Sequence, residues 1–86
     1  MMADYGNVRV VVRETAIHRY YASSPDLPGL HVYTRREEDL AKEISTAIRE
    51  LYDAKGSNVR AAPQSGGPRA LPWVWSVEEL PARACA

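Results

Sequence analysis

The 86-residue sequence is poor in several features that mark common protein classes. It contains one cysteine, Cys85, so no disulfide can form within the chain, and this favours a reducing compartment. No apolar run approaches the roughly 20 residues that a membrane-spanning helix needs, and the N-terminus lacks the apolar segment of a signal peptide. These absences predict a soluble protein of the cytoplasm that does not contact a membrane.

The chain also lacks phenylalanine and has no excess of charge of either sign. Its 11 basic and 11 acidic residues give a formal net charge of zero. This balance argues against general nucleic-acid binding, because neutralising phosphates requires a surplus of Lys and Arg. Without Phe, two Trp, five Tyr and the aliphatic residues must fill the core of a single small domain. A core of this size is only marginally sufficient, so self-association into a dimer or larger homo-oligomer is expected.

An amphipathic helix is the clearest element that the sequence predicts. Apolar residues recur every three or four positions from Leu40 to Tyr52, and charged residues occupy most of the other positions. Thr34 and Glu37 have the spacing of a capping box, so the helix is predicted to open at Thr34. Gly56 follows the last apolar residues and is typical of a helix end. One face of this helix is therefore expected to cover the core.

Extended segments are predicted on both sides of the helix. In residues 7–14 every second position from Val8 to Val12 is valine, and Arg9, Val11 and Arg13 fall on the other side, as in a half-buried strand. Residues 18–23 and 30–33 follow as two more strands. Residues 58–62 are predicted to return beside the first strand, parallel to it, after a right-handed crossover. The expected fold class is α+β: a small antiparallel three-stranded sheet plus a fourth parallel strand, with one helix across one face, in the order β-β-β-α-β.

A stiff turn separates the second and third strands. Pro25 and Pro28 have no backbone N–H to donate to a sheet, and Gly29 allows a positive φ. Asp26 lies between the prolines, where its side chain is expected to accept hydrogen bonds from turn amides. These four residues are interpreted as structural.

The remainder of the chain divides by composition. Residues 1–62 are expected to form the domain, residues 63–72 a linker rich in Pro and Gly, and residues 73–86 a partly ordered C-terminal segment. Trp73 and Trp75 alternate as in a short strand, with both indoles on one side. They either cover a thin core or anchor a partner protein, and the sequence leaves both interpretations open.

The segment from Ser24 to Leu30, followed by Thr34 and an acid-rich helix, resembles the HicB-type antitoxin domain. The resemblance covers about residues 8–62 and centres on the PDLPG turn and the Thr-x-x-Glu helix start. It implies a reduced ribonuclease H fold. It also implies that the domain binds and neutralises a small HicA-type toxin, a ribonuclease that cleaves messenger RNA. Many members append a DNA-binding module, whereas the tail here is short and rich in proline. The resemblance therefore implies a stand-alone domain without direct DNA binding.

Catalysis is not expected from these residues. A ribonuclease H site needs several carboxylates from the first strand, the helix and the fourth strand to hold divalent metal ions, and the two strands offer only Glu14. No metal or other cofactor is therefore predicted. The alternative is a small hydrolase or ribonuclease that uses His18, His31 or Asp26. An orphan homo-oligomeric domain is a further possibility.

The predicted function is that of a non-catalytic protein-interaction domain. Its contacts are expected to come from edge strands and from the helix, where acidic residues outnumber basic ones. The residues predicted to contact a partner are Glu38, Glu43, Glu50, Trp73 and Trp75. The expected partners are a HicA-type toxin and a second copy of the chain.

Overall fold

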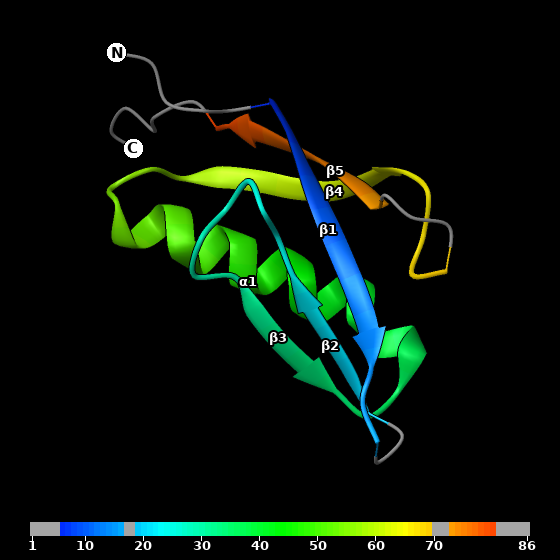
Figure 1. Ribbon diagram of the computed structural model, residues 1–86. Helices are drawn as coiled ribbons and strands as arrows, with labels where there is room; N and C mark the ends of the chain where they lie inside the picture. The colour runs from blue at the N-terminus through cyan, green and yellow to red at the C-terminus, as the bar shows by residue number, and fades with distance from the viewer. Residues whose placement is uncertain (1–5, 17–18, 70–72, 81–86) are drawn as a thin grey trace.

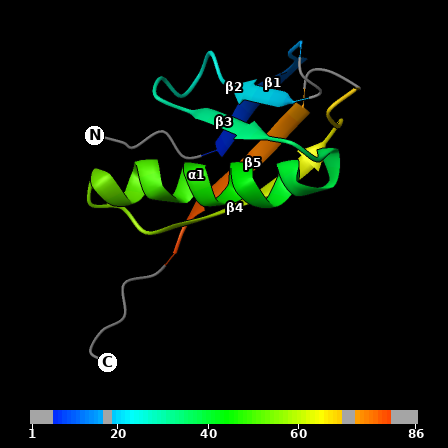
Figure 2. The same cartoon turned by 90° about the horizontal axis from the view of Figure 1, so that it is seen from below.

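The computed structural model describes residues 6–16, 19–69 and 73–80, which form a five-stranded antiparallel sheet with one long helix packed on it (Figure 1). The elements in chain order are β1 (Gly6–Glu14), β2 (Tyr20–Ser23), β3 (His31–Thr34), the 3-10 turn η1 (Glu37–Asp39), α1 (Leu40–Ala54), β4 (Val59–Ser65) and β5 (Trp73–Glu79). Figure 2 shows α1 lying across the sheet, where it contacts β3 and β4. Three predictions, for His18, for Cys85 and for residues 70–72, lie outside the described residues.

The predicted pairing of three antiparallel strands with a parallel fourth is wrong. The strand order is β3-β2-β1-β5-β4, so β5 lies between β1 and β4 and is antiparallel to both. β4 runs in the same direction as β1 but does not pair with it. The reason is burial: β5 places Trp73, Trp75 and Val77 on the helix side, and all three are buried. A strand with so much apolar surface is stabilised by an internal position with neighbours on both sides.

β4 suits the edge position that it occupies. Only Val59 and Ala61 of this strand are buried, and both lie near its start. The strand continues past the predicted end through Pro63 to Ser65, with a shift of register against β5 between these two residues. Proline has no N–H for a second ladder, so a strand that contains it is best placed at the edge of a sheet.

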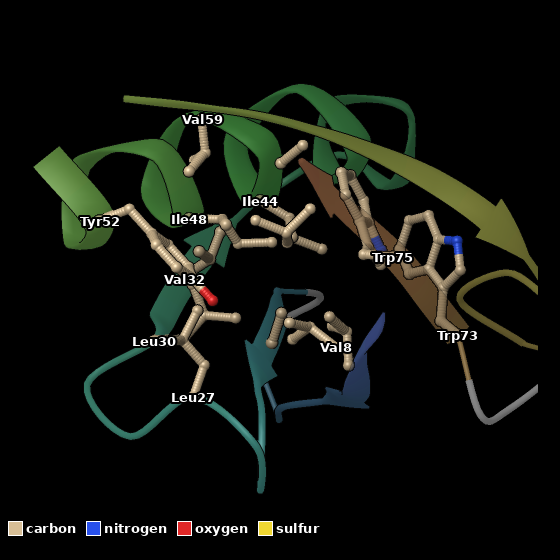
Figure 3. Packing of buried hydrophobic residues seen from close by; sticks show 14 of the residues in the cluster. Val8, Leu27, Leu30, Val32, Ile44, Ile48, Tyr52, Val59, Trp73 and Trp75 are labelled. Atoms are coloured by element: carbon tan, nitrogen blue, oxygen red, sulfur yellow. The ribbon is translucent and has the colours of Figure 1, made fainter. Parts of the chain in front are cut away.

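The core lies between the concave face of the sheet and α1 (Figure 3). The helix contributes the buried residues Leu40, Ile44, Ile48 and Tyr52, which confirms the predicted apolar stripe. In β1 the alternation is also confirmed at Val8 and Val10, which are buried while Arg9 is exposed. The tryptophans of β5 extend the core beyond the predicted domain of residues 1–62.

The two ends of the helix differ in how well the sequence predicts them. Gly56 has φ of +87° and donates its N–H to the carbonyl of Asp53, while Ser57 donates to Tyr52, both at 2.9 Å. These two bonds form a Schellman motif, so the predicted end at Gly56 is confirmed. The prediction that Thr34 caps the helix is wrong. Thr34 is the last residue of β3, and its hydroxyl donates to the carbonyl of Arg36. Neither η1 nor α1 has a side-chain cap hydrogen bond.

Candidate interaction surfaces

The sheet has two edge strands, β3 and β4, and they differ in how they are protected. β4 carries Pro63, the register shift and the charged Arg60, which are features that discourage another strand from pairing. β3 has the sequence HVYT, without proline, shift of register or a permanently charged side chain. Among the described residues the backbone of β3 is hydrogen-bonded only to β2. The outer edge of β3 is therefore open to strand addition.

Three rings gather beside that edge, on the face of the sheet opposite α1. The Tyr21 ring stacks on Tyr33, with centroids 4.8 Å apart, and on His31, with centroids 5.9 Å apart. The Tyr21 hydroxyl and His31 Nδ1 lie 2.6 Å apart and share a hydrogen bond. Tyr33 is 66% exposed and is the one large apolar side chain classed as exposed in the described part of the chain. Large exposed rings of this kind are enriched at protein interfaces.

The outward side of α1 carries an acidic stripe, formed by its N-cap residue Asp39 and by Glu43, Glu50 and Asp53. Spacings of four, seven and three residues place these carboxylates on one side of the helix. All four are exposed, and none forms an ion pair with another described residue. The predicted contact residues Glu43 and Glu50 belong to the stripe. Glu38 does not, because its position falls outside this spacing and its carboxylate pairs with Arg36.

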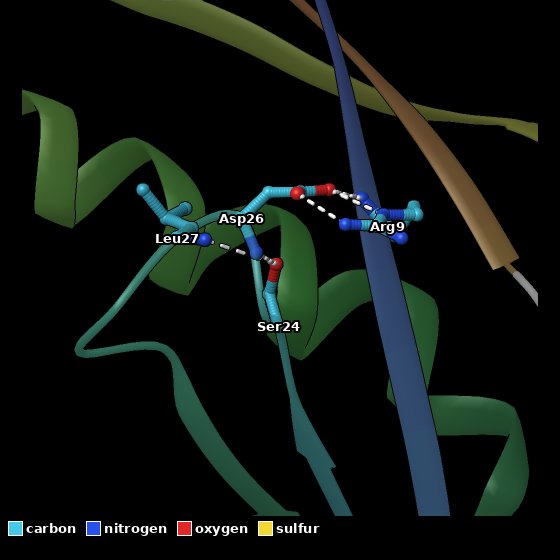
Figure 4. A network of polar contacts seen from close by, with 4 residues as sticks. All are labelled: Arg9, Ser24, Asp26 and Leu27. Carbon is cyan, nitrogen blue, oxygen red and sulfur yellow. Dashed lines mark hydrogen bonds and ion pairs between the residues drawn. The ribbon is translucent and has the colours of Figure 1, made fainter.

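The turn between β2 and β3 is fixed by a pair of charged residues (Figure 4). Asp26 accepts two hydrogen bonds from the Arg9 guanidinium, at 2.8 and 2.9 Å, and a third from the Arg9 backbone N–H at 2.9 Å. The turn amides of Asp26 and Leu27 donate instead to the Ser24 hydroxyl. Asp26 thus fastens the turn to β1, a role different from the predicted one.

The rest of the turn follows the prediction. Gly29 has φ of +99°, and a Cβ there would lie 3.4 Å from Leu51 of the helix. Pro25 and Pro28 are exposed, whereas Leu27 and Leu30 on the same turn are buried in the core. The turn therefore contributes apolar side chains to the core and positions the first residue of β3.

The Arg9 pair gives the protein an acid-dependent contribution to stability. Hydrogen bonds from Arg9 lower the pKa of Asp26 from 3.8 to about 2. Because the folded pKa lies below the ordinary value, the pair stabilises the fold above about pH 4, and this contribution is lost as the pH falls through about 2. The pair is solvent-exposed, so the effect is small.

We expect Asp26→Asn to remove this dependence, because the amide does not titrate. Urea unfolding between about pH 6 and pH 2 should show a shallower loss of stability on acidification for Asp26→Asn than for the wild type. Glu78→Gln is the matched control, since that carboxylate is exposed and 4.0 Å from Arg60. Equal acid dependence in wild type and Asp26→Asn would show that the Arg9 pair does not contribute.

Both tryptophans predicted as core or contact residues lie in the core. Trp73 is 5% exposed and Trp75 is fully buried. Their rings meet edge to face, with centroids 5.3 Å apart. Buried indoles are not available to a partner of the folded chain, so the contact surface has to be built from other residues.

The residues of the catalytic alternative have separate partners. His31 contacts Tyr21 and Asp26 contacts Arg9, and no hydrogen bond joins His31 to Asp26. The part of the chain that the structure describes contains no group of three or more His, Cys, Asp or Glu residues placed to hold a metal ion. The geometry therefore offers contact surfaces, and it does not assemble His31 and Asp26 into a shared site.

Comparison with known proteins does not assign the chain to a family. No family model matches the sequence, and no curated protein and no solved structure matches it either. Among the described residues, no helix has both the length and the apolar character needed to span a bilayer.

Proposed function

We propose that this chain is a non-catalytic protein-interaction domain. The observation that carries the proposal is the outer edge of β3, which is unpaired among the described residues and lacks the devices that protect β4. Strand addition to such an edge provides affinity through backbone hydrogen bonds, and nearby side chains provide specificity. The exposed ring of Tyr33 lies beside this edge and can provide such specificity. The acidic stripe of α1 offers a second, charged surface.

The charge of the acidic stripe indicates the chemistry of a heterologous partner. Four carboxylates without a described ion-pair partner attract a basic protein and speed its association. The resemblance of the PDLPG turn to HicB-type antitoxins supplies the class to test first, a small basic HicA-type ribonuclease toxin. In this role the chain acts in the cytoplasm, where it neutralises the toxin by binding it and does not itself bind DNA.

The experiment is co-expression of the tagged full chain with a small basic HicA-type toxin. We expect the two proteins to purify together and the chain to restore growth of cells that express the toxin. The double variant Glu43→Lys/Glu50→Lys should weaken the complex about 10-fold or more, because like charges then face each other. The measurement is the dissociation constant by titration calorimetry, with unfolding curves to show that the variant is folded.

Glu78→Lys/Glu79→Lys is the control, because it changes the net charge equally at two exposed residues of β5 that are not part of the stripe. It should bind the toxin as the wild type does. A failure of the wild-type chain to bind or to rescue growth would contradict the antitoxin role. Equal losses in the two double variants would contradict the assignment of the stripe as the contact surface.

A further inference from the structure

We propose that the outer edge of β3 pairs with β3 of a second copy of the chain, antiparallel, about a two-fold axis at Val32. This inference rests on the proposed function, since it names the occupant of the same edge. Its result would be a homodimer in which two five-stranded sheets continue into one another.

A strand edge is complementary to itself under a two-fold axis. Along an antiparallel ladder each strand presents N–H and C=O groups in alternation, so two copies of one edge satisfy each other's donors and acceptors. β3 meets the requirements for such pairing, because its four residues continue without proline or a shift of register. The other edge of the sheet does not, because Pro63 and the register shift interrupt β4. The dimer contact is therefore assigned to β3 alone.

The burial of alternate residues limits the register. Val32 is 6% exposed and points toward the helix side, whereas His31 and Tyr33 are exposed on the opposite face. Residues directly opposite each other in an antiparallel pair lie on the same face, and a slip of one residue would exchange the faces. Continuous faces across the dimer are therefore obtained when the axis passes through Val32 or through Tyr33.

Side-chain chemistry favours the axis at Val32. In that register Val32 meets its own copy, Tyr33 lies opposite His31 of the second copy, and Arg35 lies opposite Gly29 of the second copy. With the axis at Tyr33, Arg35 would instead lie opposite His31, so that two side chains able to carry positive charge would meet. Pairing at Val32 also extends the stack of Tyr21 and Tyr33 with a ring from the second copy.

The same register accounts for the exposure of Tyr33. A ring that is 66% exposed in the single chain becomes covered on the side that faces the second copy. Cross-strand pairs that include an aromatic ring are among those that stabilise sheets. The contact between the two copies would thus pair the free edge of β3 and cover the ring of Tyr33.

Cysteine cross-linking tests both the dimer and its register. Opposite residues of an antiparallel pair have Cα atoms about 4.5 to 5.5 Å apart, within the roughly 4.4 to 6.8 Å that a disulfide spans. In a Cys85→Ser background, Val32→Cys is expected to form a disulfide-linked dimer on mild oxidation. Tyr33→Cys and Ala62→Cys, the latter on the β4 edge, are matched controls that should remain monomeric on a non-reducing gel.

Sedimentation of the unmodified chain provides a readout that needs no cysteine. The wild type should sediment as a dimer, and Tyr33→Lys should raise the dimer dissociation constant about 10-fold or more, because lysine on an edge strand opposes pairing. Tyr33 is on the surface, so this variant is expected to fold. A wild type that stays monomeric, or cross-linking at Tyr33→Cys in place of Val32→Cys, would overturn the inference.

The experiments distinguish a failure of the dimer from a failure of the proposed function. If the chain is monomeric but binds the basic toxin, only the dimer is wrong. If the dimer cross-links at Val32→Cys and no toxin is bound, the dimer stands and the antitoxin role is wrong.

Discussion

A chain that ends at residue 72 is expected to be unfolded under conditions in which the full chain is folded. The truncation removes β5, which pairs with β1 on one side and β4 on the other, so both ladders are lost. It also removes the buried side chains Trp73, Trp75 and Val77. Losing one buried tryptophan costs about 3 to 5 kcal/mol, and a small domain has only about 5 to 15 kcal/mol in total.

The measurement is far-UV circular dichroism with thermal melting of the truncated and full chains. The matched control ends at Leu80, which keeps every element of the described structure while removing residues 81–86. This control should melt cooperatively, close to the full chain. A cooperative transition in the chain that ends at residue 72 would show that β1 to β4 form a domain without β5, as the division at residue 62 predicts.

The parts of the fold that the sequence predicts well are those that depend on local periodicity. The apolar stripe of α1 follows from a repeat of three and four residues, and the end of the helix follows from one glycine, Gly56. The alternation in β1 and the turn at Pro25 to Gly29 are local in the same way. Each of these features is specified within a few residues, so the rest of the chain has little influence on it.

The position of β5 was not predictable from local pattern. Trp73, Trp75 and Val77 alternate and so indicate a strand, but the neighbours of a strand depend on residues that are distant in the chain. After the helix, β4 can either pair directly with β1 or leave a position between them for a later strand. The apolar surface of residues 73–77 favours the second arrangement, because a strand at the edge of the sheet would not bury all of it.

Thr34 shows how two local signals compete. Its spacing from Glu37 is that of a capping box. It also lies two residues after Val32, where the alternation of a strand places another inward-facing residue. The strand prevails because Thr34 pairs with Tyr20 and is 8% exposed, whereas the start of the helix lies three residues later in η1. Burial and pairing over the sheet outweigh a cap of about 1 kcal/mol.

The contact surfaces were predictable in part. The acidic stripe follows from the helical repeat, which is why Glu43 and Glu50 belong to it. Contacts from edge strands were also expected, and β3 is an edge strand. The ring of Tyr33 was missed, because the face on which a side chain lies cannot be read from four residues. One signal was present: residues 31–34 contain no proline or Asp, Glu, Lys or Arg, whereas Pro63 marks the other edge.

Trp75→Ala is expected to destabilise the protein by about 3 to 5 kcal/mol, because Trp75 is fully buried and its removal leaves a large cavity. Trp75→Phe should cost much less. The indole Nε1 of Trp75 is buried and has no hydrogen-bond partner among the described residues. An unpaired buried donor costs about 1 to 3 kcal/mol, and phenylalanine removes that donor while filling most of the space.

Trp73→Phe is the matched control, since Trp73 is also buried and contacts the same ring but is not among the side chains with an unsatisfied buried donor. Urea unfolding of the three variants gives the comparison, followed by circular dichroism because each variant changes the tryptophan fluorescence. We expect Trp75→Phe to lose less stability than Trp73→Phe, although Trp75 is the more deeply buried residue. If Trp75→Phe were the more damaging change, the indole N–H of Trp75 would have to be satisfied in solution, and cavity volume alone would determine the cost.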